Sequence, residues 1–208
     1  MKAQILSMLQ LQDTMNQKVH PSWRTQGFKW TRAIMVEGVE ALEHYGWKWW
    51  KKQEPDLPQL RIELVDIWHF IMSDAIESNP NCSMEENAEQ FARRFAIGAP
   101  GYLVDSDPRK NLELLIGAAA YEEVNFKAFL ALMEQVGLSF EDLNRIYTGK
   151  NVLNMFRQNH GYKEGTYVKI WDGLEDNVVL DSIMQALPSA TPGEILSALE
   201  RSYAQVTA

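Results

Sequence analysis

"LRIELVDIWHFIMSDAI", residues 60–76, is the stretch of sequence that decides the fold. Its apolar side chains occur on nearly every side of a helix, which is typical of a helix buried in a protein core. Glu63 and Asp66 interrupt the run three residues apart, so they share one face of that helix. No lysine or arginine follows Arg61 in this stretch. The segment therefore predicts a buried helix over about residues 57–76 with a narrow acidic stripe.

Helical periodicity continues along the rest of the chain. Gly and Pro residues bound a second long helix, predicted over about residues 31–51, and Ser83 with Glu86 three residues later forms a capping box at 83–96. Further helical segments are predicted at residues 3–17, 108–137 (as one or two helices), 139–161 and 191–205. Strand alternation is scarce, with "TYVKIW" (166–171) as the one fair candidate. The patterns predict an all-α helical bundle in one domain, residues 1–208, with a looser part after Asp172.

The composition limits the class of protein. A net charge of −8 argues against a nucleic-acid or membrane-surface protein, because phosphate-backbone binding normally needs a basic surface. The single cysteine, Cys82, leaves no intramolecular disulfide, which fits a reducing compartment. The N-terminus lacks the apolar run of a signal peptide, and the longest apolar run, "LLIGAAAY" (114–121), is too short for a membrane span. We therefore expect a cytoplasmic protein that binds neither nucleic acid nor membrane.

Two pairs of carboxylates occur on the two long predicted helices. Glu37 and Glu40 in "VEGVE" are three residues apart, as are Glu63 and Asp66, so each pair shares a helix face. Partly buried carboxylates are unfavourable unless a cation or hydrogen-bond donors compensate them. Four oxygen donors on facing helices suit a hard divalent ion such as Mg²⁺, which keeps waters and bridges to phosphates. The alternative is that Glu37 and Glu40 are surface charges and Asp66 bonds a neighbour; Glu43 is expected to face solvent or support the ligands.

A row of polar side chains lies on the helix predicted at 139–161. Lys150, Asn154 and Arg157 follow one another at i, i+4 and i+7, which places them on one side of the helix. In an acidic chain this row indicates a local site for a negative group such as a phosphate, for which Arg and Lys supply charged donors. The alternative is that the helix dipole attracts basic residues to the C-terminus, which explains Lys163 but not the row. The candidates that follow the row are Tyr162, Lys163 and Lys169.

Four segments together resemble one known family. The chain is similar to the all-α nucleoside triphosphate pyrophosphatases and, within them, to the dimeric all-α dUTP diphosphatases. The pattern ExxE followed by ExxD is shared with relatives of other specificity, whereas the "WKWW" segment and the block at 149–177 are more specific. The segments that carry the resemblance are "LQLQDTMN" (9–16), "WRTQGFKWTRAIMVEGVEALEHYGWKWWK" (23–51), "IELVDIWHF" (62–70) and "GKNVLNMFRQNHGYKEGTYVKIWDGLEDN" (149–177).

The resemblance implies a reaction, a cofactor and an assembly. The reaction is hydrolysis of dUTP and of dUDP to dUMP, with attack of a metal-activated water on the β-phosphorus. Two or three Mg²⁺ ions are implied at Glu37, Glu40, Glu63 and Asp66, with Glu37 also as the base for the water. Lys150, Asn154, Arg157, Tyr162 and Lys169 resemble the phosphate clamp of the family. A homodimer is implied by the resemblance alone.

Reading of the base is expected near the N-terminus. Gln12 and Asn16 share a helix face, and their amides can supply both partners to the acceptor–donor–acceptor edge of uracil; the family places its base-reading amides in this stretch. Trp49 and Phe70 are candidates for stacking on base and deoxyribose, with His69 beside the sugar. Each has an alternative, because aromatic residues at helical spacing often belong to the core and a single His is often only hydrogen-bonded.

Three rival interpretations remain open. A di-iron oxidoreductase uses two Glu-x-x-His motifs, and this chain offers only Asp66 with His69 at that spacing. A helical interaction module could dock a basic partner on the acidic stripe, but this leaves the row at 150–157 unexplained. The third alternative is a related pyrophosphatase that prefers dCTP or a modified nucleotide.

Overall fold

The computed structural model describes residues 1–98 and 105–206, and its regular structure is almost entirely helical, which confirms the all-α prediction. In chain order the elements are α1 (Lys2–Val19), the 3-10 helix η1 (Trp23–Thr25), α2 (Trp30–Tyr45), α3 (Leu57–Ser78), α4 (Met84–Ile97), α5 (Pro108–Ala120), α6 (Phe126–Gln135), α7 (Phe140–Asn159), β1 (Ile170–Trp171), β2 (Leu174–Glu175), α8 (Asp176–Ala186) and α9 (Pro192–Val206).

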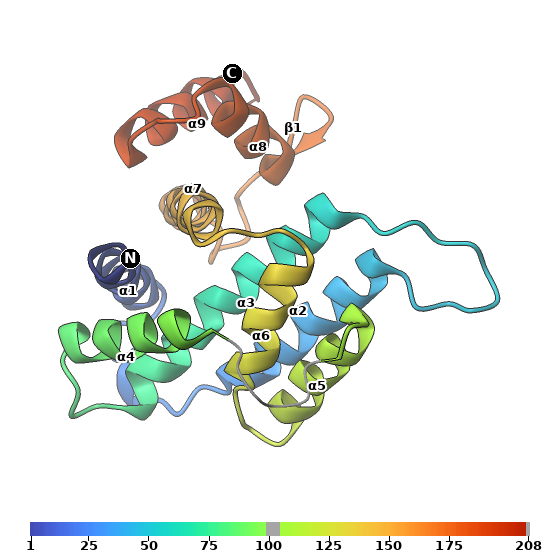
Figure 1. Cartoon of the computed structure of the whole chain (residues 1–208). Helices are drawn as coiled ribbons and strands as arrows, with labels where there is room; N and C mark the ends of the chain where they lie inside the picture. Colours follow the sequence, from blue (N-terminus) through green and yellow to red (C-terminus); the bar gives the residue numbers. More distant parts are fainter. Residues whose placement is uncertain (99–104, 207–208) are drawn as a thin grey trace.

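The helix α3 lies at the centre of the fold. Its N-terminus is fixed by the Asp56 side chain, which accepts a hydrogen bond from Gln59 N at 3.2 Å, and Pro58 lies in the first turn. The helix contacts α1, α2, α4, α6 and α7 (Figure 1). Its buried residues lie on several sides, from Leu60 to Ile76. The prediction of a buried helix at 57–76 is therefore confirmed.

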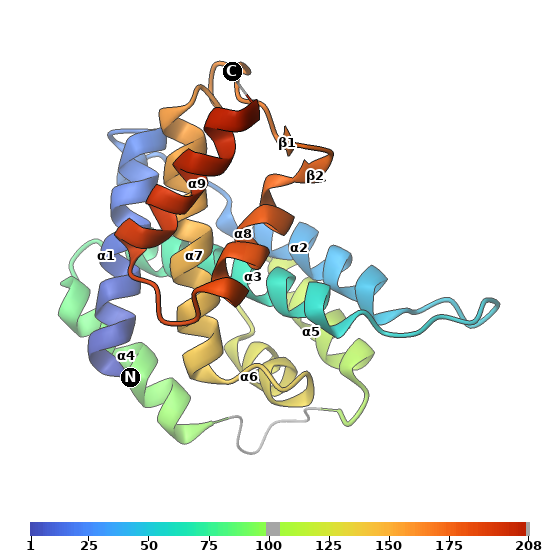
Figure 2. The same cartoon turned by 90° about the horizontal axis from the view of Figure 1, so that it is seen from above.

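The helix α2 ends earlier than the sequence pattern predicted. It was expected to reach about residue 51, but it ends at Tyr45, and Gly46 follows with a positive φ of 87° that disfavours other residues. The "WKWW" segment consequently belongs to the connection between α2 and α3, which projects from the rest of the molecule (Figures 1 and 2). At the other side of α2, Gly38 permits close packing on α5, because a Cβ there would lie 2.8 Å from Ile116 Cγ1.

Most other predicted helices are confirmed with their caps. The capping box at Ser83 and Glu86 is present at the start of α4. The segment 108–137 forms two helices, α5 and α6, and Asn125 caps the second by accepting a hydrogen bond from Ala128 N. Within the described ranges, no helix combines the length and apolar character needed to cross a membrane.

The helix α7 joins two apolar clusters. Leu143 and Tyr147 belong to the larger cluster with α1–α6, whereas Leu153 and Phe156 pack with α8, α9 and Trp171 in a second cluster. In Figure 1, α8 and α9 lie on the opposite side of α7 from α2 and α5. The prediction of a looser part after Asp172 was wrong, because α8 and α9 bury their own apolar faces against α7.

The predicted strand at 166–171 is mostly absent. Only Ile170 and Trp171 form a strand, paired antiparallel with Leu174 and Glu175. Asp172 and Gly173 make the two-residue turn with positive φ values of 52° and 83°, which matches the twist that tight hairpins favour. The short hairpin places the start of α8 against α7.

Candidate functional site

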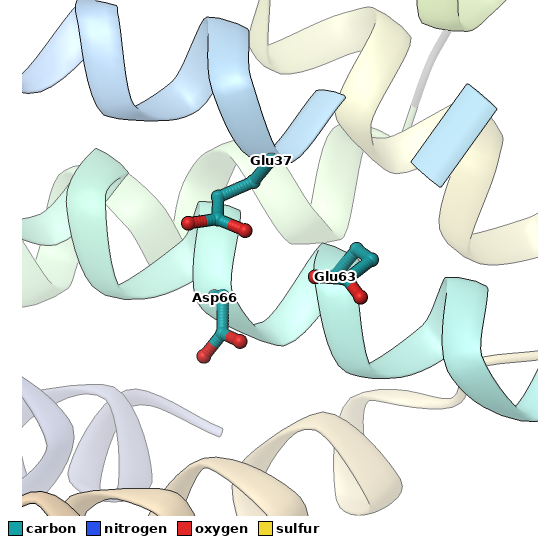
Figure 3. A group of neighbouring side chains, drawn as sticks. All are labelled: Glu37, Glu63 and Asp66. Carbon is teal, nitrogen blue, oxygen red and sulfur yellow. The ribbon is translucent and has the colours of Figure 1, made fainter. Parts of the chain in front are cut away.

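Three carboxylates gather between α2 and α3. Glu37 reaches from α2 toward Glu63 and Asp66 of α3, and one oxygen from each lies within 4.8 Å of the others (Figure 3). Glu40, which the spacing also placed here, is exposed and lies outside this group of three. Its charge still raises the pKa of both Glu37 and Glu63. The structure thus brings together three of the four predicted carboxylates and keeps the fourth nearby.

The carboxylate cluster carries more negative charge than its surroundings neutralise. Burial, followed by the charges of Asp66 and Glu40, raises the pKa of Glu37 from 4.5 to about 8. Burial and the same two charges raise the pKa of Glu63 to about 7, against the opposing effect of Lys150. Glu37 and Glu63 are also hydrogen-bonded to each other, so the pair holds a proton near neutral pH. Such a cluster favours a cation that replaces this proton.

Two basic side chains contact the carboxylate cluster. Lys150 of α7, only 7% exposed, lies with Nζ 2.9 Å from Asp66 Oδ2. His44 Nε2 lies 3.3 Å from Glu63 Oε1. Sequence reasoning missed His44 as a neighbour of this cluster, although it lies two helical turns after Glu37 on α2. All donors in the cluster are carboxylate oxygens, which fits a hard ion such as Mg²⁺ better than a softer metal.

A cavity of about 240 Å³ lies beside the carboxylates, with Asp66 in its lining. One wall consists of aromatic rings. Trp30 and Phe70 lie nearly parallel with centroids 6.4 Å apart, and Phe28 meets Trp30 edge-on at 5.7 Å. Glu77 fixes the Trp30 ring by accepting a hydrogen bond from Nε1 at 2.6 Å. Such a wall suits a planar apolar face, with polar groups from α1, α3 and α7 completing the lining.

The amides of Gln12 and Asn16 form a buried network along this cavity. Gln12 Nε2 donates to Asn16 Oδ1 at 3.0 Å and to Ser73 Oγ at 3.1 Å. Asn16 Nδ2 donates to the same hydroxyl at 2.9 Å. Gln12 Oε1 accepts from Tyr147 and lies 2.8 Å from His69 Nδ1. The predicted proximity of Gln12, Asn16 and His69 is therefore observed, with Ser73 and Tyr147 as partners that the sequence did not reveal.

His69 is held in one protonation state by this network. Because Gln12 presents its oxygen, Nδ1 of His69 carries the ring proton and Nε2 is a bare acceptor. Burial, with the charge of Lys150, lowers the pKa of His69 to about 3, so the ring is neutral at physiological pH. Nε2 is buried and has no hydrogen-bond partner among the described residues. Nδ1 of His20, which lines the same cavity, is also buried and has no hydrogen-bond partner among the described residues.

The polar row on α7 is present, but its charges are largely neutralised within the chain. Arg157 Nε and Nη2 each donate to one oxygen of Asp176 at 2.8 Å, and Nη1 donates to Asn154 Oδ1 at 3.1 Å. Asp176 is fully buried and also accepts from Tyr167 at 2.7 Å. Although burial alone raises the pKa of Asp176, the hydrogen bonds and charge of Arg157 lower it below its ordinary value. Lys150 and Arg157 also approach Asn177 Oδ1, each at 3.4 Å.

Sequence reasoning missed the role of Asp176 and Asn177. The signal was the acidic segment "GLEDN" (173–177), which follows the basic row in the sequence and reaches it through the hairpin. Lys169 pairs with Glu175 at 3.2 Å, and Lys163 Nζ donates to the carbonyl of Val19 at 3.0 Å. The remaining candidate in this region, Tyr162, is half exposed, and its ring lies 5.9 Å from the guanidinium of Arg157.

Trp49, one of the two predicted stacking residues, lies apart from the cavity. It is 89% exposed on the projecting connection between α2 and α3, where it contacts Trp50 edge-on at 5.7 Å. Phe70, the other stacking candidate, lines the cavity. Within a single chain, therefore, only Phe70 of the two predicted stacking residues lies at the site.

Comparison with known proteins gives one family. The family model described as dUTPase matches residues 4–162, which contain the carboxylate cluster, the cavity and all of α7. No curated protein matches the chain.

Proposed function

The chain belongs to the all-α dUTPase family, and on that premise we propose that it hydrolyses dUTP and dUDP to dUMP with Mg²⁺. The observation that carries the proposal is a cluster of carboxylates with too little positive charge, placed beside a cavity with an aromatic wall. The carboxylates suit a divalent cation, and the cavity suits a planar base. The matched family supplies the identity of the nucleotide.

Glu37, Glu63 and Asp66, with Glu40 at the edge, are the residues that would hold two or three Mg²⁺ ions. Bound Mg²⁺ neutralises phosphate oxygens and lowers the pKa of the attacking water. Glu37 is the base in this proposal: with its proton displaced by the bound cations, its carboxylate would be free to accept a proton from the attacking water. Attack at the β-phosphorus accounts for both dUTP and dUDP as substrates, because dUMP leaves in each case.

The row on α7 has two roles in this proposal. Lys150 leaves Asp66 when cations bind there, and its ammonium moves to the substrate phosphates. Asn154, in the cavity lining, donates a neutral hydrogen bond to the same region. Arg157 is committed to Asp176 by two hydrogen bonds, so it acts mainly by fixing α8 to α7 and by orienting Asn154. Tyr162, Lys163 and Lys169 remain candidates for contacts to the outer phosphate.

The nucleoside occupies the cavity in this proposal. The base stacks on the wall that includes Phe70, the Asn16 amide donates to its edge, and Gln12 orients Asn16 by donating to its Oδ1. His69 Nε2, an acceptor that no described residue pairs, accepts a hydrogen bond from the deoxyribose hydroxyl in this proposal. This satisfies a buried atom whose desolvation is otherwise unfavourable by about 1–3 kcal/mol.

A homodimer explains the position of Trp49. The projecting connection carries Trp47, Trp49 and Trp50 in exposed positions, and Val36 and Val39 of α2 are also exposed. Exposed apolar groups of this size are typical of an interface between proteins. We propose that Trp49 of one subunit reaches the site of the other, which retains its stacking role.

Product release from dUTP, dUDP, dTTP, dCTP and UTP with Mg²⁺ tests this function, with pyrophosphate and phosphate measured separately. We expect pyrophosphate from dUTP, phosphate from dUDP, and slow turnover of the others. Preferential turnover of dCTP would instead support the related pyrophosphatase and contradict the assignment of the base. Absence of turnover with every nucleotide would contradict the proposed activity and favour the interaction module.

A further inference from the structure

We propose, as a consequence of the proposed function, that His20 is a specificity-determining residue whose Nδ1–H donates a hydrogen bond to a carbonyl oxygen of the uracil ring. The inference starts from the buried polar atoms. Among the described residues, two buried side-chain polar atoms have no hydrogen-bond partner, His20 Nδ1 and His69 Nε2. Both residues line the same cavity. Buried unpaired groups are rare in native proteins, so two at one cavity indicate a ligand that completes both.

The position of His20 follows from the end of α1. One polar row lines the cavity: Gln12 and Asn16 share a face of α1, and His20 follows the helix directly. His20 is the residue after the helix, with extended backbone (φ −147°, ψ 111°), and its N–H still bonds to the carbonyl of Asn16. Pro21 favours this extended conformation in the residue before it. The backbone therefore holds the His20 ring in a defined place.

The His20 ring continues the aromatic wall of the cavity. Its centroid lies 5.8 Å from that of Phe28 in an edge contact, and Phe28 in turn contacts Trp30. Trp30 stacks on Phe70, the residue next to His69. The cavity is thus bounded by a continuous line of rings from His20 to Phe70, and a planar base against this line meets the polar row of α1 at its edge.

The hydrogen-bond donors that remain on Asn16 and His20 match the two carbonyl groups of uracil. Uracil presents two carbonyl acceptors, whereas both N–H groups of the Gln12 amide are engaged with Asn16 and Ser73. Asn16 donates one N–H to Ser73 and retains a second. The His20 imidazole, with a proton on Nδ1, supplies the other donor. Asn16 and His20 together then satisfy the two carbonyl groups.

Two substitutions separate a hydrogen bond from packing. His20→Leu keeps an apolar side chain against Phe28 but removes the donor. His20→Asn places an amide close to the position of Nδ1 and restores a donor there. The measurement is the dissociation constant of the hydrolysis-resistant α,β-imido-dUTP with Mg²⁺, by calorimetry on the full chain. Tripolyphosphate with Mg²⁺ serves as the control ligand, because it lacks the base.

We expect His20→Leu to weaken the binding of α,β-imido-dUTP about tenfold and His20→Asn to recover most of this loss. Binding of tripolyphosphate should be the same in all three proteins. Equal affinity of the His20→Leu variant and the unchanged protein for α,β-imido-dUTP would overturn the role of His20 alone, as would a His20→Asn variant as weak as His20→Leu. Failure of the unchanged protein to bind α,β-imido-dUTP would overturn the proposed function and this inference with it.

Discussion

The carboxylate cluster on α2 and α3 and the polar row on α7 are both charged and both partly buried, but only one is neutralised. In the row, Arg157 is paired with Asp176 through two hydrogen bonds of 2.8 Å. In the cluster, Glu37, Glu63 and Asp66 share one lysine, and the pKa values of both glutamates are raised. The paired charges join α8 to α7, whereas the carboxylates without full neutralisation form the site at which we propose that a cation binds.

We expect the largest effect, a loss of dUTP turnover, when a carboxylate of the cluster is removed. Glu63→Gln should lower the turnover of dUTP by about a thousandfold or more, because the amide cannot hold a divalent cation as a carboxylate does. Thermal unfolding and circular dichroism should show a folded helical protein. Normal turnover in this variant would contradict the role of the cluster in catalysis.

Removal of one of the paired charges should lower stability, whereas removal of a cluster carboxylate should lower turnover and leave the protein folded. Asp176→Ala is expected to destabilise the protein by about 3–5 kcal/mol, because it leaves the Arg157 guanidinium buried without its partner. Urea unfolding measures this change. The double variant Arg157→Met, Asp176→Leu should recover a large part of the loss. If Asp176→Ala were as stable as the unchanged protein, the pair would not fix α8 to α7.

The fold was predictable from the sequence where local signals and burial agree. The apolar surface of residues 57–76 predicted the central helix, and the capping box predicted the start of α4. The end of α2 was missed, because the apolar "WKWW" continues the helical pattern while Gly46 turns the chain away. The helix α8 was missed because its start depends on a hairpin and on the buried Asp176, which have no strong local signal.

The candidate site was predictable to a similar extent. Helical spacing placed Glu37 near the acidic stripe of α3 and aligned Lys150 with Asn154 and Arg157. Spacing cannot tell whether a basic residue is free or paired, so the commitment of Arg157 to Asp176 came only from the structure. Nor can it show that Trp49 lies on a projecting connection, since that follows from the packing of both neighbouring helices.

The unpaired cluster should also affect stability in a pH-dependent way. The pKa of Glu37 is raised to about 8 in the folded metal-free protein, so between about pH 4.5 and pH 8 the folded state retains a proton that the unfolded chain has lost. Stability from this group is complete below pH 4.5 and is lost as the pH rises through 8. Glu37→Gln should therefore stabilise the metal-free protein at pH 8.5 by about 2 kcal/mol, after allowance for solvent screening, and have a much smaller effect at pH 5. Chemical denaturation in EDTA at the two pH values measures this difference, and an equal effect at both would contradict the raised pKa.

The smallest effect concerns the one lysine that both regions share. Lys150→Met should increase the affinity for Mg²⁺ by about 1 kcal/mol, because the ammonium no longer occupies Asp66 or repels the ion. The same variant should bind α,β-imido-dUTP more weakly, since a donor to the phosphates is lost. Calorimetry with Mg²⁺ and with α,β-imido-dUTP measures the two changes in affinity. Weaker binding of Mg²⁺ by this variant would contradict the proposal that a cation replaces Lys150 at Asp66.

Proton release on binding of Mg²⁺ tests the central claim most directly. Calorimetric titration of the full chain in two buffers with different ionisation enthalpies gives the number of protons released per ion. Because the Glu37–Glu63 pair holds about one proton near neutral pH, we predict release of about one proton per carboxylate cluster when it fills with Mg²⁺ at pH 7 and almost none at pH 9.5, with saturable binding abolished in Glu63→Gln. Binding without proton release at pH 7, or undiminished binding in the variant, would show that these carboxylates are not the cation site.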